Sequence, residues 1–301
     1  MKVKSFVEIA KNEYNLDLSI IVGEDKAEEK QIKSGVTNRP GLSLAGFFDN
    51  FAYDRVQIIG KGEQAYIDTI YREKDEEKKR YIEKFFSFDI PCCIVSDFKG
   101  LPEEFMEIAG RSGVPIIVSS LDTYQLTFSV ELILNNELAP RTVVNGGMFD
   151  IFGYGVLIIG RSGIGKSEVG LELLSRKHRF VCDDIVLVKK IRYPEGYRAV
   201  AFPYSRESLN LIEVRGIGMV NVEELFGAGF TIPRKEIDMV IELVDWDSNF
   251  VMDRIGNNIE TYEVLGIKLP KRTIPVTPGR NIAFLIETAI INERIRRKGK
   301  V

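Results

Sequence analysis

The sequence contains very little histidine and cysteine, and this scarcity excludes several kinds of active site. The chain of 301 residues has a single histidine, His178, and three cysteines, Cys92, Cys93 and Cys182. A His-rich metal site is therefore excluded, and a Ser–His or Cys–His catalytic pair would have to use His178. Because His178 follows a segment with helical periodicity, packing at a helix end is the favoured interpretation. No cysteine lies in a Cys-x-x-Cys motif or in zinc-ligand spacing.

Long apolar runs and a strong excess of one charge are absent as well. No run reaches the ~18 apolar residues that a membrane-spanning helix needs, and charges interrupt residues 1–18, which therefore do not resemble a signal peptide. The 41 basic and 44 acidic residues give a net charge of −3, which favours neither nucleic acid nor an anionic membrane as partner. We expect a cytoplasmic protein with reduced thiols.

The length and the order of segments predict an α/β fold with two domains. Short apolar runs rich in β-branched residues predict strands at 19–23, 55–60, 91–96 and 115–120. Helical patterns lie between them at 64–86 and 101–113.

A long helical pattern at 121–141 follows, with Ser120 or Asp122 as its N-cap and Pro140 as its stop. We place the domain boundary within this pattern. The prediction is an N-terminal α/β domain at 1–132 and a second domain at 133–301, where glycine and strand-like runs become frequent.

The second domain contains a glycine-rich loop between a strand and a helix. The apolar run "GVLIIG" (155–160) is followed by "RSGIGKS" (161–167), and "EVGLELLSRK" then begins a helix. The order strand, GxxxxGK[ST], helix is typical of a P-loop. Glycines permit positive φ, so that backbone N–H groups turn towards an anion; the lysine supplies positive charge to the β/γ-phosphates, and the serine hydroxyl can bind Mg²⁺. The predicted phosphate-binding residues are Gly160, Arg161, Ser162, Gly163, Ile164, Gly165, Lys166 and Ser167.

Two adjacent aspartates interrupt the next apolar segment, "HRFVCDDIVLV" (178–188). Carboxylates inside a strand are costly to bury unless a metal or hydrogen bonds compensate. We expect this segment to lie on a strand neighbouring the P-loop strand, where only one aspartate of a regular strand would face the phosphates. Of Asp183 and Asp184, one can orient Mg²⁺ and the other can accept a proton from a substrate hydroxyl. The alternative is a turn with solvated aspartates.

The stretch "SLNLIEVRGIGMVNVEELFGAG" (208–229) offers a carboxylate and a guanidinium around a glycine-rich turn. Glu213 and Arg215 precede Gly216 and Gly218, at which the backbone can approach a ligand closely, although a purely structural turn fits equally well. Further along, Arg254 and Arg280 lie on loops with Pro and Gly, from which arginines can clamp a transferring phosphoryl group or simply face solvent. These residues predict Mg²⁺-dependent phosphoryl transfer from ATP or GTP, and they leave the acceptor open.

Long stretches of the chain resemble the bacterial HPr kinase/phosphorylase family. The matching segments are "GVLIIGRSGIGKSEVGLELLSRKHRFVCDD", "EVRGIGMVNVEELFGAG", "IPVTPGRNIAFLIETAIINERI", "NRPGLSLAGFFDNFAYDRVQIIGKGE" and "ELAPRTVVNGGMFDIFGYGVLI". The resemblance covers nearly the whole chain, and "RGIGMVNVEELFGAG" is its most specific part.

The resemblance implies a bifunctional enzyme. Such enzymes use ATP to phosphorylate a serine of HPr, the small carrier protein of the sugar phosphotransferase system, and reverse the modification by phosphorolysis, consuming phosphate and releasing pyrophosphate. It also implies a P-loop kinase domain similar to phosphoenolpyruvate carboxykinase and a homo-oligomer, a hexamer, with HPr docked across subunits.

The resemblance also assigns roles to residues. Lys166 would bind phosphates, and Ser167 and Glu213 would bind Mg²⁺. Asp184 would accept the serine proton in phosphorylation and donate one in the reverse direction, and Arg254 would be an active-site arginine. The segment linked to dephosphorylation would be Pro275, Val276, Thr277, Pro278, Gly279 and Arg280.

Two positions depart from the family pattern. Asn145 stands where the family usually has an active-site histidine, and Arg161 stands where it usually has an acidic residue. Asparagine can hydrogen-bond a phosphate but cannot carry positive charge. Arg161 can add charge near the phosphates or point to solvent. Two alternatives therefore stay open, namely a nucleotide-binding regulator without catalysis and a kinase with a different acceptor.

Overall fold

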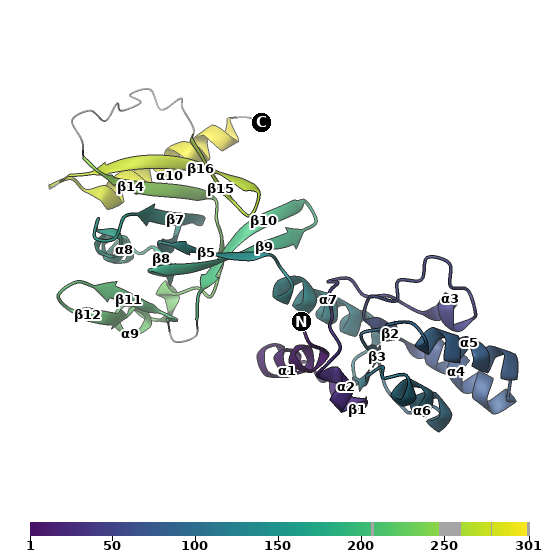
Figure 1. The fold of residues 1–301 in the computed structure, drawn as a ribbon. Coiled ribbons are helices and arrows are strands. Elements are labelled where there is room, and N and C mark those ends of the chain that lie inside the picture. The colour runs from purple at the N-terminus through teal and green to yellow at the C-terminus, as the bar shows by residue number, and fades with distance from the viewer. Residues whose placement is uncertain (206–207, 247–259, 278, 300–301) are drawn as a thin grey trace. The chain divides into compact units, whose positions relative to one another are not determined.

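The computed structural model describes residues 1–205, 208–246, 260–277 and 279–299 (Figure 1). The chain divides into two compact units, Met1–Ala139 and Pro140–Val301. The sequence-based boundary between residues 132 and 133 falls within helix α7 (Thr123–Glu137), which belongs whole to the first unit. None of the described helices is both long enough and apolar enough to cross a membrane.

The first unit contains one four-stranded sheet whose two faces are both covered. Its strands, in sheet order, are β1 (Ser19–Val22), β4 (Ile116–Val118), β3 (Cys93–Val95) and β2 (Gln57–Ile59). Neighbours β2, β3 and β4 run parallel, and β1 is antiparallel to β4. Successive side chains alternate between the faces, so Ile58 packs in one apolar core and Ile59 in the other. These strands confirm the α/β prediction.

Seven helices surround this sheet: α1 (Val3–Tyr14), α2 (Glu24–Ala27), α3 (Gly41–Leu44), α4 (Lys61–Glu73), α5 (Glu76–Phe86), α6 (Glu103–Arg111) and α7. The prediction of a single helix over 64–86 is wrong. Lys74 has a φ of 55° and ends α4, and the Asp75 side chain accepts the backbone N–H of Lys78 and begins α5. Asp122, one of the two expected caps, begins α7 by accepting the N–H of Gln125.

The second unit is built on a six-stranded sheet that carries the P-loop. Its strands, in sheet order, are β15 (Glu260–Val264), β16 (Ile267–Val276), β14 (Met239–Asp245), β7 (Tyr154–Gly160), β6 (Gly147–Ile151) and β8 (Arg179–Cys182). Strands β7, β14 and β16 are parallel, with Gly160 opposite Leu243 and Asp245 opposite Val276. Their carboxyl ends therefore meet at one edge of the sheet, where the P-loop begins.

Helices cover one face of this sheet and a second sheet covers the other. Helices α8 (Lys166–Ser175) and α10 (Ile282–Lys298) share a core with strands β7 and β14, and Val169, Leu173 and Leu174 are buried there as predicted. On the other face lies a four-stranded sheet in the order β13 (Lys235–Glu236), β10 (Gly196–Pro203), β9 (Ile185–Tyr193) and β5 (Arg141–Asn145). A hairpin of β11 (Leu211–Val214) and β12 (Gly218–Asn221) leads to α9 (Val222–Phe226) and the short 3₁₀ helix η1 (Ala228–Phe230).

The segment 178–188 differs from its prediction as one strand beside the P-loop strand. It forms two strands in two sheets, β8 and β9, and the turn between them holds both aspartates. Strand β8 is separated from β7 by β6, because β6 pairs with both. The aspartates thus reach the P-loop from a turn and not from an adjacent strand.

Candidate active site

The P-loop has the backbone conformation that its glycines predict. Gly163 and Gly165 have φ values of 88° and 102°, a region that glycine enters without a steric cost. Gly165 is the N-cap of α8, so the positive end of that helix faces the loop. The Lys166 ammonium donates to the backbone oxygens of Gly160 and Arg161, both at 3.1 Å, and Ile164 anchors the loop in the apolar core.

Ser167 and Asp183 are joined by a hydrogen bond within the site. The Ser167 hydroxyl donates to Asp183 Oδ2 at 2.7 Å. The Asp183 side chain is buried, and its Oδ1 has no hydrogen-bond partner among the described residues. Burial raises the pKa of Asp183, and the hydrogen bond from Ser167 opposes this shift. A buried carboxylate oxygen without a partner is costly unless a cation compensates it.

Asp184 occupies a tight turn with a left-handed backbone. Its φ is 67°, and the N–H of Ile185 donates to the carbonyl of Asp183 across it at 2.8 Å. Such three-residue turns are rare and strained, and strain of this kind is concentrated at functional sites. The Asp184 side chain is exposed, and both aspartates line the same pocket as the P-loop. In a regular strand only one of the two aspartates could face the phosphates. In this turn both can.

The β11–β12 hairpin brings a second charged pair to this pocket. Glu213 lies on β11, and Arg215 is the first residue after this strand. Both residues line the pocket. Arg215 Nη1 donates to the carbonyl oxygen of Gly163 at 3.4 Å. Gly216 and Gly218 have φ values of 79° and 105° and form the turn of the hairpin, outside the pocket lining.

The resulting pocket has a volume of about 60 Å³ and is strongly polar. The P-loop, the aspartate turn and the hairpin all contribute to it. Its lining residues are Ser162, Gly163, Gly165, Lys166, Ser167, Glu168, Asp183, Asp184, Glu213 and Arg215. The sequence reasoning missed Glu168, although an acidic residue in the first turn after a P-loop serine was a visible signal. Gly160, Arg161 and Ile164 belong to the loop but do not line the pocket.

Arg161 is exposed, as one of its two expectations had it, and it also has a partner that was not expected. Its guanidinium forms a two-bonded ion pair with Asp245, in which Nη2 donates to Oδ1 at 2.6 Å and Nε donates to Oδ2. The hydrogen bond from Arg161 lowers the pKa of Asp245. Asp245 is the last residue of β14, the strand beside β7. It was not predicted, and the signal was an apolar run, "MVIELV", closed by an aspartate.

The other predicted site residues lie near the P-loop edge of the six-stranded sheet or outside the described residues. Asn145 ends β5 opposite Ile185, and the N–H of Gly146 donates to the carbonyl of Asp184 at 2.9 Å, so Asn145 adjoins the aspartate turn. Arg254 lies outside the described residues.

The segment 275–280 is not a loop throughout, because Pro275 and Val276 are the last residues of β16. The described loop residues are Thr277, Gly279 and Arg280; Pro278 lies outside the description, and Arg280 is exposed and does not line the pocket.

The polar residues of the pocket fit a cation held together with phosphates. Within the described ranges, no group of three or more His, Cys, Asp or Glu side chains is arranged to hold a metal alone. Mg²⁺ usually takes only one or two carboxylates and completes its shell with water and substrate phosphates. Asp183, Ser167 and Glu213 line one pocket and suit that arrangement.

Comparisons with known proteins find similarity over nearly the whole chain. Family models described as HPr Serine kinase N terminus and HPr Serine kinase C-terminal domain match residues 2–134 and 136–301. The HPr kinase/phosphorylase of Treponema pallidum (strain Nichols) is 40% identical over 95% of this chain and 87% of its own length. That of Alkaliphilus metalliredigens (strain QYMF) is 42% identical over 87% of this chain and 82% of its own. A solved structure of the HPr(Ser) kinase/phosphatase from Coxiella burnetii, 32% identical, covers 53% of this chain and 94% of that chain with a TM-score of 0.49.

Both family models together span almost the whole sequence, and the two relatives match over most of their length. The chain therefore belongs to the HPr kinase/phosphorylase family.

Proposed function

We propose that this protein uses ATP and Mg²⁺ to phosphorylate a serine of the carrier protein HPr and reverses the modification by phosphorolysis. The observation that carries the proposal is the single pocket that unites a P-loop lysine and serine with an aspartate pair and a further glutamate, Glu213. Each of these groups has a distinct role in phosphoryl transfer, and family membership supports HPr as the acceptor.

The P-loop supplies the positive charge. Lys166, the N-terminal end of α8 and Arg215 all face the pocket, where they would hold the β- and γ-phosphates and stabilise the charge that develops on the transferring group. The Lys166 ammonium is already held against the loop by two backbone carbonyls, so its charge is positioned.

Two side chains would bind the metal ion, and a third would orient one of them. Ser167 and Glu213 are its proposed ligands, and Asp183 fixes the serine hydroxyl through their hydrogen bond. When bound, Mg²⁺ neutralises phosphate charge and orients the phosphoryl group.

Asp184 is the proposed proton acceptor and donor. Its carboxylate is exposed in the pocket, whereas Asp183 is buried and occupied by Ser167. In the forward direction Asp184 takes the proton of the HPr serine hydroxyl as its oxygen attacks the γ-phosphorus of ATP and ADP leaves. In reverse, inorganic phosphate attacks the phosphoserine phosphorus, pyrophosphate forms, and Asp184 returns the proton to the departing serine oxygen.

The proposal extends to three features that the family resemblance implies: a phosphoenolpyruvate-carboxykinase-like second domain, a hexamer, and HPr docking across subunits. Sedimentation of the purified protein would measure the number of subunits.

A paired assay with purified HPr tests the function. One arm supplies Mg-ATP and follows phosphoserine; the other supplies phospho-HPr and phosphate and follows pyrophosphate. We expect activity in both arms, and we expect Asp184→Asn to abolish both while ADP binding persists, because asparagine cannot accept the proton. Glu195→Gln, at an exposed acid outside the pocket, is the matched control and should retain activity. Wild-type inactivity in both arms with nucleotide still bound would refute HPr as acceptor, and near wild-type phosphorylation by Asp184→Asn would refute the role of the aspartate.

A further inference from the structure

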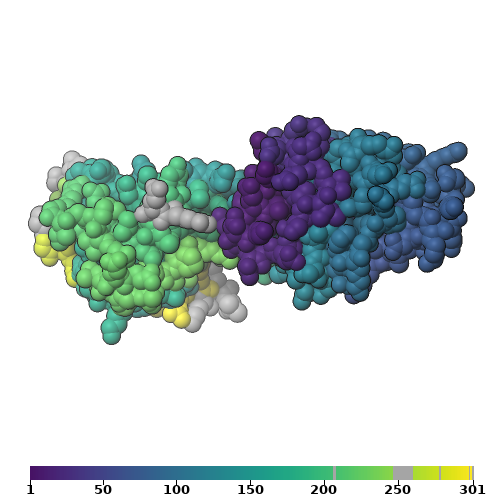
Figure 2. Space-filling view, turned by 90° about the horizontal axis from the view of Figure 1, so that it is seen from below, coloured from purple at the N-terminus to yellow at the C-terminus, as the bar shows by residue number. Residues whose placement is uncertain are grey.

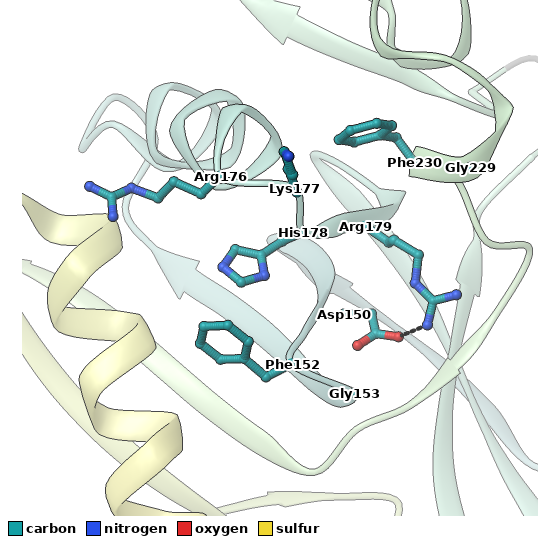
Figure 3. A pocket seen from close by; sticks show the side chains of 9 residues that line it. All are labelled: Asp150, Phe152, Gly153, Arg176, Lys177, His178, Arg179, Gly229 and Phe230. Carbon is teal, nitrogen blue, oxygen red and sulfur yellow. Dashed lines mark hydrogen bonds and ion pairs between the residues drawn. The ribbon is translucent and has the colours of Figure 1, made fainter.

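A second and larger cavity lies at the opposite end of helix α8 from the P-loop (Figure 3). Its volume is about 550 Å³, and it shares no lining residue with the P-loop pocket. Lys166 begins α8, whereas Lys177 lies just beyond its last turn, and ten helical residues extend about 15 Å. Sites for small molecules typically measure roughly 300–1,000 Å³, so this cavity has the size of a separate binding site.

Positive charges outnumber negative ones around this cavity. The Asp150 carboxylate is only 2% exposed and contacts two cations, Arg179 Nη2 and Lys235 Nζ, the latter at 3.4 Å. Lys177 also lines the cavity, and its ammonium makes no ion pair or hydrogen bond with the part of the chain that is described. Three cations against one carboxylate leave a surplus of two positive charges.

Neighbouring carboxylates are already paired with cations that do not contact Asp150. The pairs are Glu236 with Arg198, Asp238 with Arg297, and Glu287 with Arg176, which also pairs with the exposed Glu172. Figure 3 shows the Arg176 side chain directed towards α10 and away from the other labelled side chains, which agrees with its ion pair to Glu287. The surplus of two positive charges is therefore located at the cavity.

Two aromatic rings provide apolar contact surface beside these charges. Phe152 is 49% exposed and meets the ring of His178 edge-on at 4.7 Å between centroids. Phe230 also lines the cavity, and Figure 3 shows its ring on the other side of the labelled group from Phe152. A ligand with a ring would gain favourable contacts from both phenyl groups.

The backbone at Phe152 indicates that its ring is kept for contact. Phe152 and Gly153 form a two-residue turn between β6 and β7, with Ile151 opposite Tyr154, and their φ values are 53° and 85°. Turns with two positive φ values strongly prefer Asn-Gly, and a bulky residue with positive φ is an outlier. Strained residues of this kind cluster at ligand-binding sites. Phe152 is about half exposed and can contact a ligand.

We infer that this cavity binds a small organic phosphate, a molecule with a phosphate monoester group attached to a ring. The phosphate lies between Lys177 and Arg179, and the ring lies against Phe152 and Phe230. The surplus of two positive charges matches the dianion of a phosphate monoester, and arginine is especially suited to phosphate oxygens. A monoanion such as a carboxylate would leave one charge unmatched.

Phenyl phosphate is the minimal probe of this chemistry, and ligand-observed NMR can measure its binding. The full chain should carry Lys166→Ala, so that the P-loop does not compete for phosphate. A ligand of this size is expected to bind with a Kd of roughly 1 mM. Inorganic phosphate and phenol, each presenting half of the probe, should bind more weakly.

Two variants separate binding from folding. Lys177→Asn removes the charge but tolerates the φ of 70° at this position, and it should weaken binding by about tenfold, the loss expected for one charged hydrogen bond. Phe152→Asn should weaken binding to a similar degree while the thermal midpoint stays equal or rises, because Asn-Gly suits the turn. Lys268→Asn, at an exposed lysine that lines neither pocket, is the control and should leave binding unchanged.

Equal binding of phenyl phosphate by the parent, Lys177→Asn and Phe152→Asn would overturn the inference, as would an absence of binding. Inorganic phosphate that binds as tightly as phenyl phosphate would refute the ring contact. A lowered thermal midpoint with unchanged binding in Phe152→Asn would show that the ring serves only to pack against His178.

Discussion

Glu287 joins the end of the P-loop helix to helix α10, and its removal provides a quantitative test of the second unit's packing. The carboxylate accepts a hydrogen bond from Arg176 Nη1 at 3.0 Å through Oε2, and its Oε1 lies 2.8 Å from His178 Nε2. The side chains of His178 and Glu287 are 4% and 13% exposed, so water does not replace these contacts. Arg176 is 31% exposed and retains a second partner, Glu172, at 3.1 Å. Glu287→Ala would therefore leave the buried histidine without its partner.

The two lost contacts differ in their contribution to stability. A hydrogen bond to a charged group contributes about 1.5–3 kcal/mol when buried, and the contact to His178 should contribute in this range. The contact to Arg176 contributes less, because that guanidinium is partly solvated and retains Glu172. Glu287→Ala should thus lower the free energy of unfolding by about 2–4 kcal/mol. At roughly 2–4 °C per kcal/mol for a unit of this size, the thermal midpoint should fall by about 4–16 °C.

Glu172→Ala is the matched control, since it removes the exposed partner of the same arginine. A surface pair at i, i+4 contributes about 0.3–0.5 kcal/mol, so the control should shift the midpoint by about 2 °C or less. Calorimetry and urea titration of both variants measure the difference. Equal and small shifts in the two variants would refute the assignment of Glu287 as the buried link between α8 and α10.

Three further predictions follow from the site and its surroundings. Lys166→Ala should lower turnover in the HPr kinase assay by at least about 10²-fold, the loss seen when one charge-stabilising donor is removed; unchanged turnover would contradict the P-loop role. Asn145→His should raise pyrophosphate release without raising kinase activity, because an imidazolium beside the Asp184 turn would attract inorganic phosphate; equal gains in both directions would contradict this reason. Burial raises the pKa of Asp238 in the folded protein. The protonated carboxyl group therefore stabilises the fold at pH values below the pKa of Asp238 in the unfolded chain, and this stabilisation is lost as the pH rises through the pKa in the folded protein. Asp238→Asn should therefore gain stability relative to the wild type between about pH 3 and pH 7, and urea titrations that show a constant difference would refute the shift.

Features confined to one short stretch could be predicted from the sequence. The P-loop is the clearest case, because a strand, a glycine-rich loop and an amphipathic helix follow one another directly in residues 155–175. The conformations of Gly163 and Gly165 and the buried face of α8 follow from these residues alone. The four strands of the first unit were predicted for the same reason, since apolar β-branched runs report burial locally.

Breaks inside apparently continuous patterns were not the favoured predictions, and at the aspartate pair a turn was only the alternative. The helical pattern of 64–86 continues through Lys74, yet one left-handed residue there separates α4 from α5. Likewise, the apolar run of 178–188 continues on both sides of Asp184, whose left-handed backbone sends the chain from one sheet into another. Hydrophobic periodicity reports which side chains are buried and says little about a single reversal of the backbone.

The sequence by itself predicted a phosphate-binding loop after β7 and provided the carboxylates and arginines that could act on a phosphate. Only the tertiary structure decided which of them meet. Ser167 and Asp183 are 16 residues apart, Arg161 and Asp245 are 84 apart, and His178 and Glu287 are 109 apart. Such partners depend on strand order and on the packing of layers, for example on the insertion of β6 between β7 and β8. Strand order depends on the burial of many side chains over the whole unit. The pattern within one segment therefore cannot predict it.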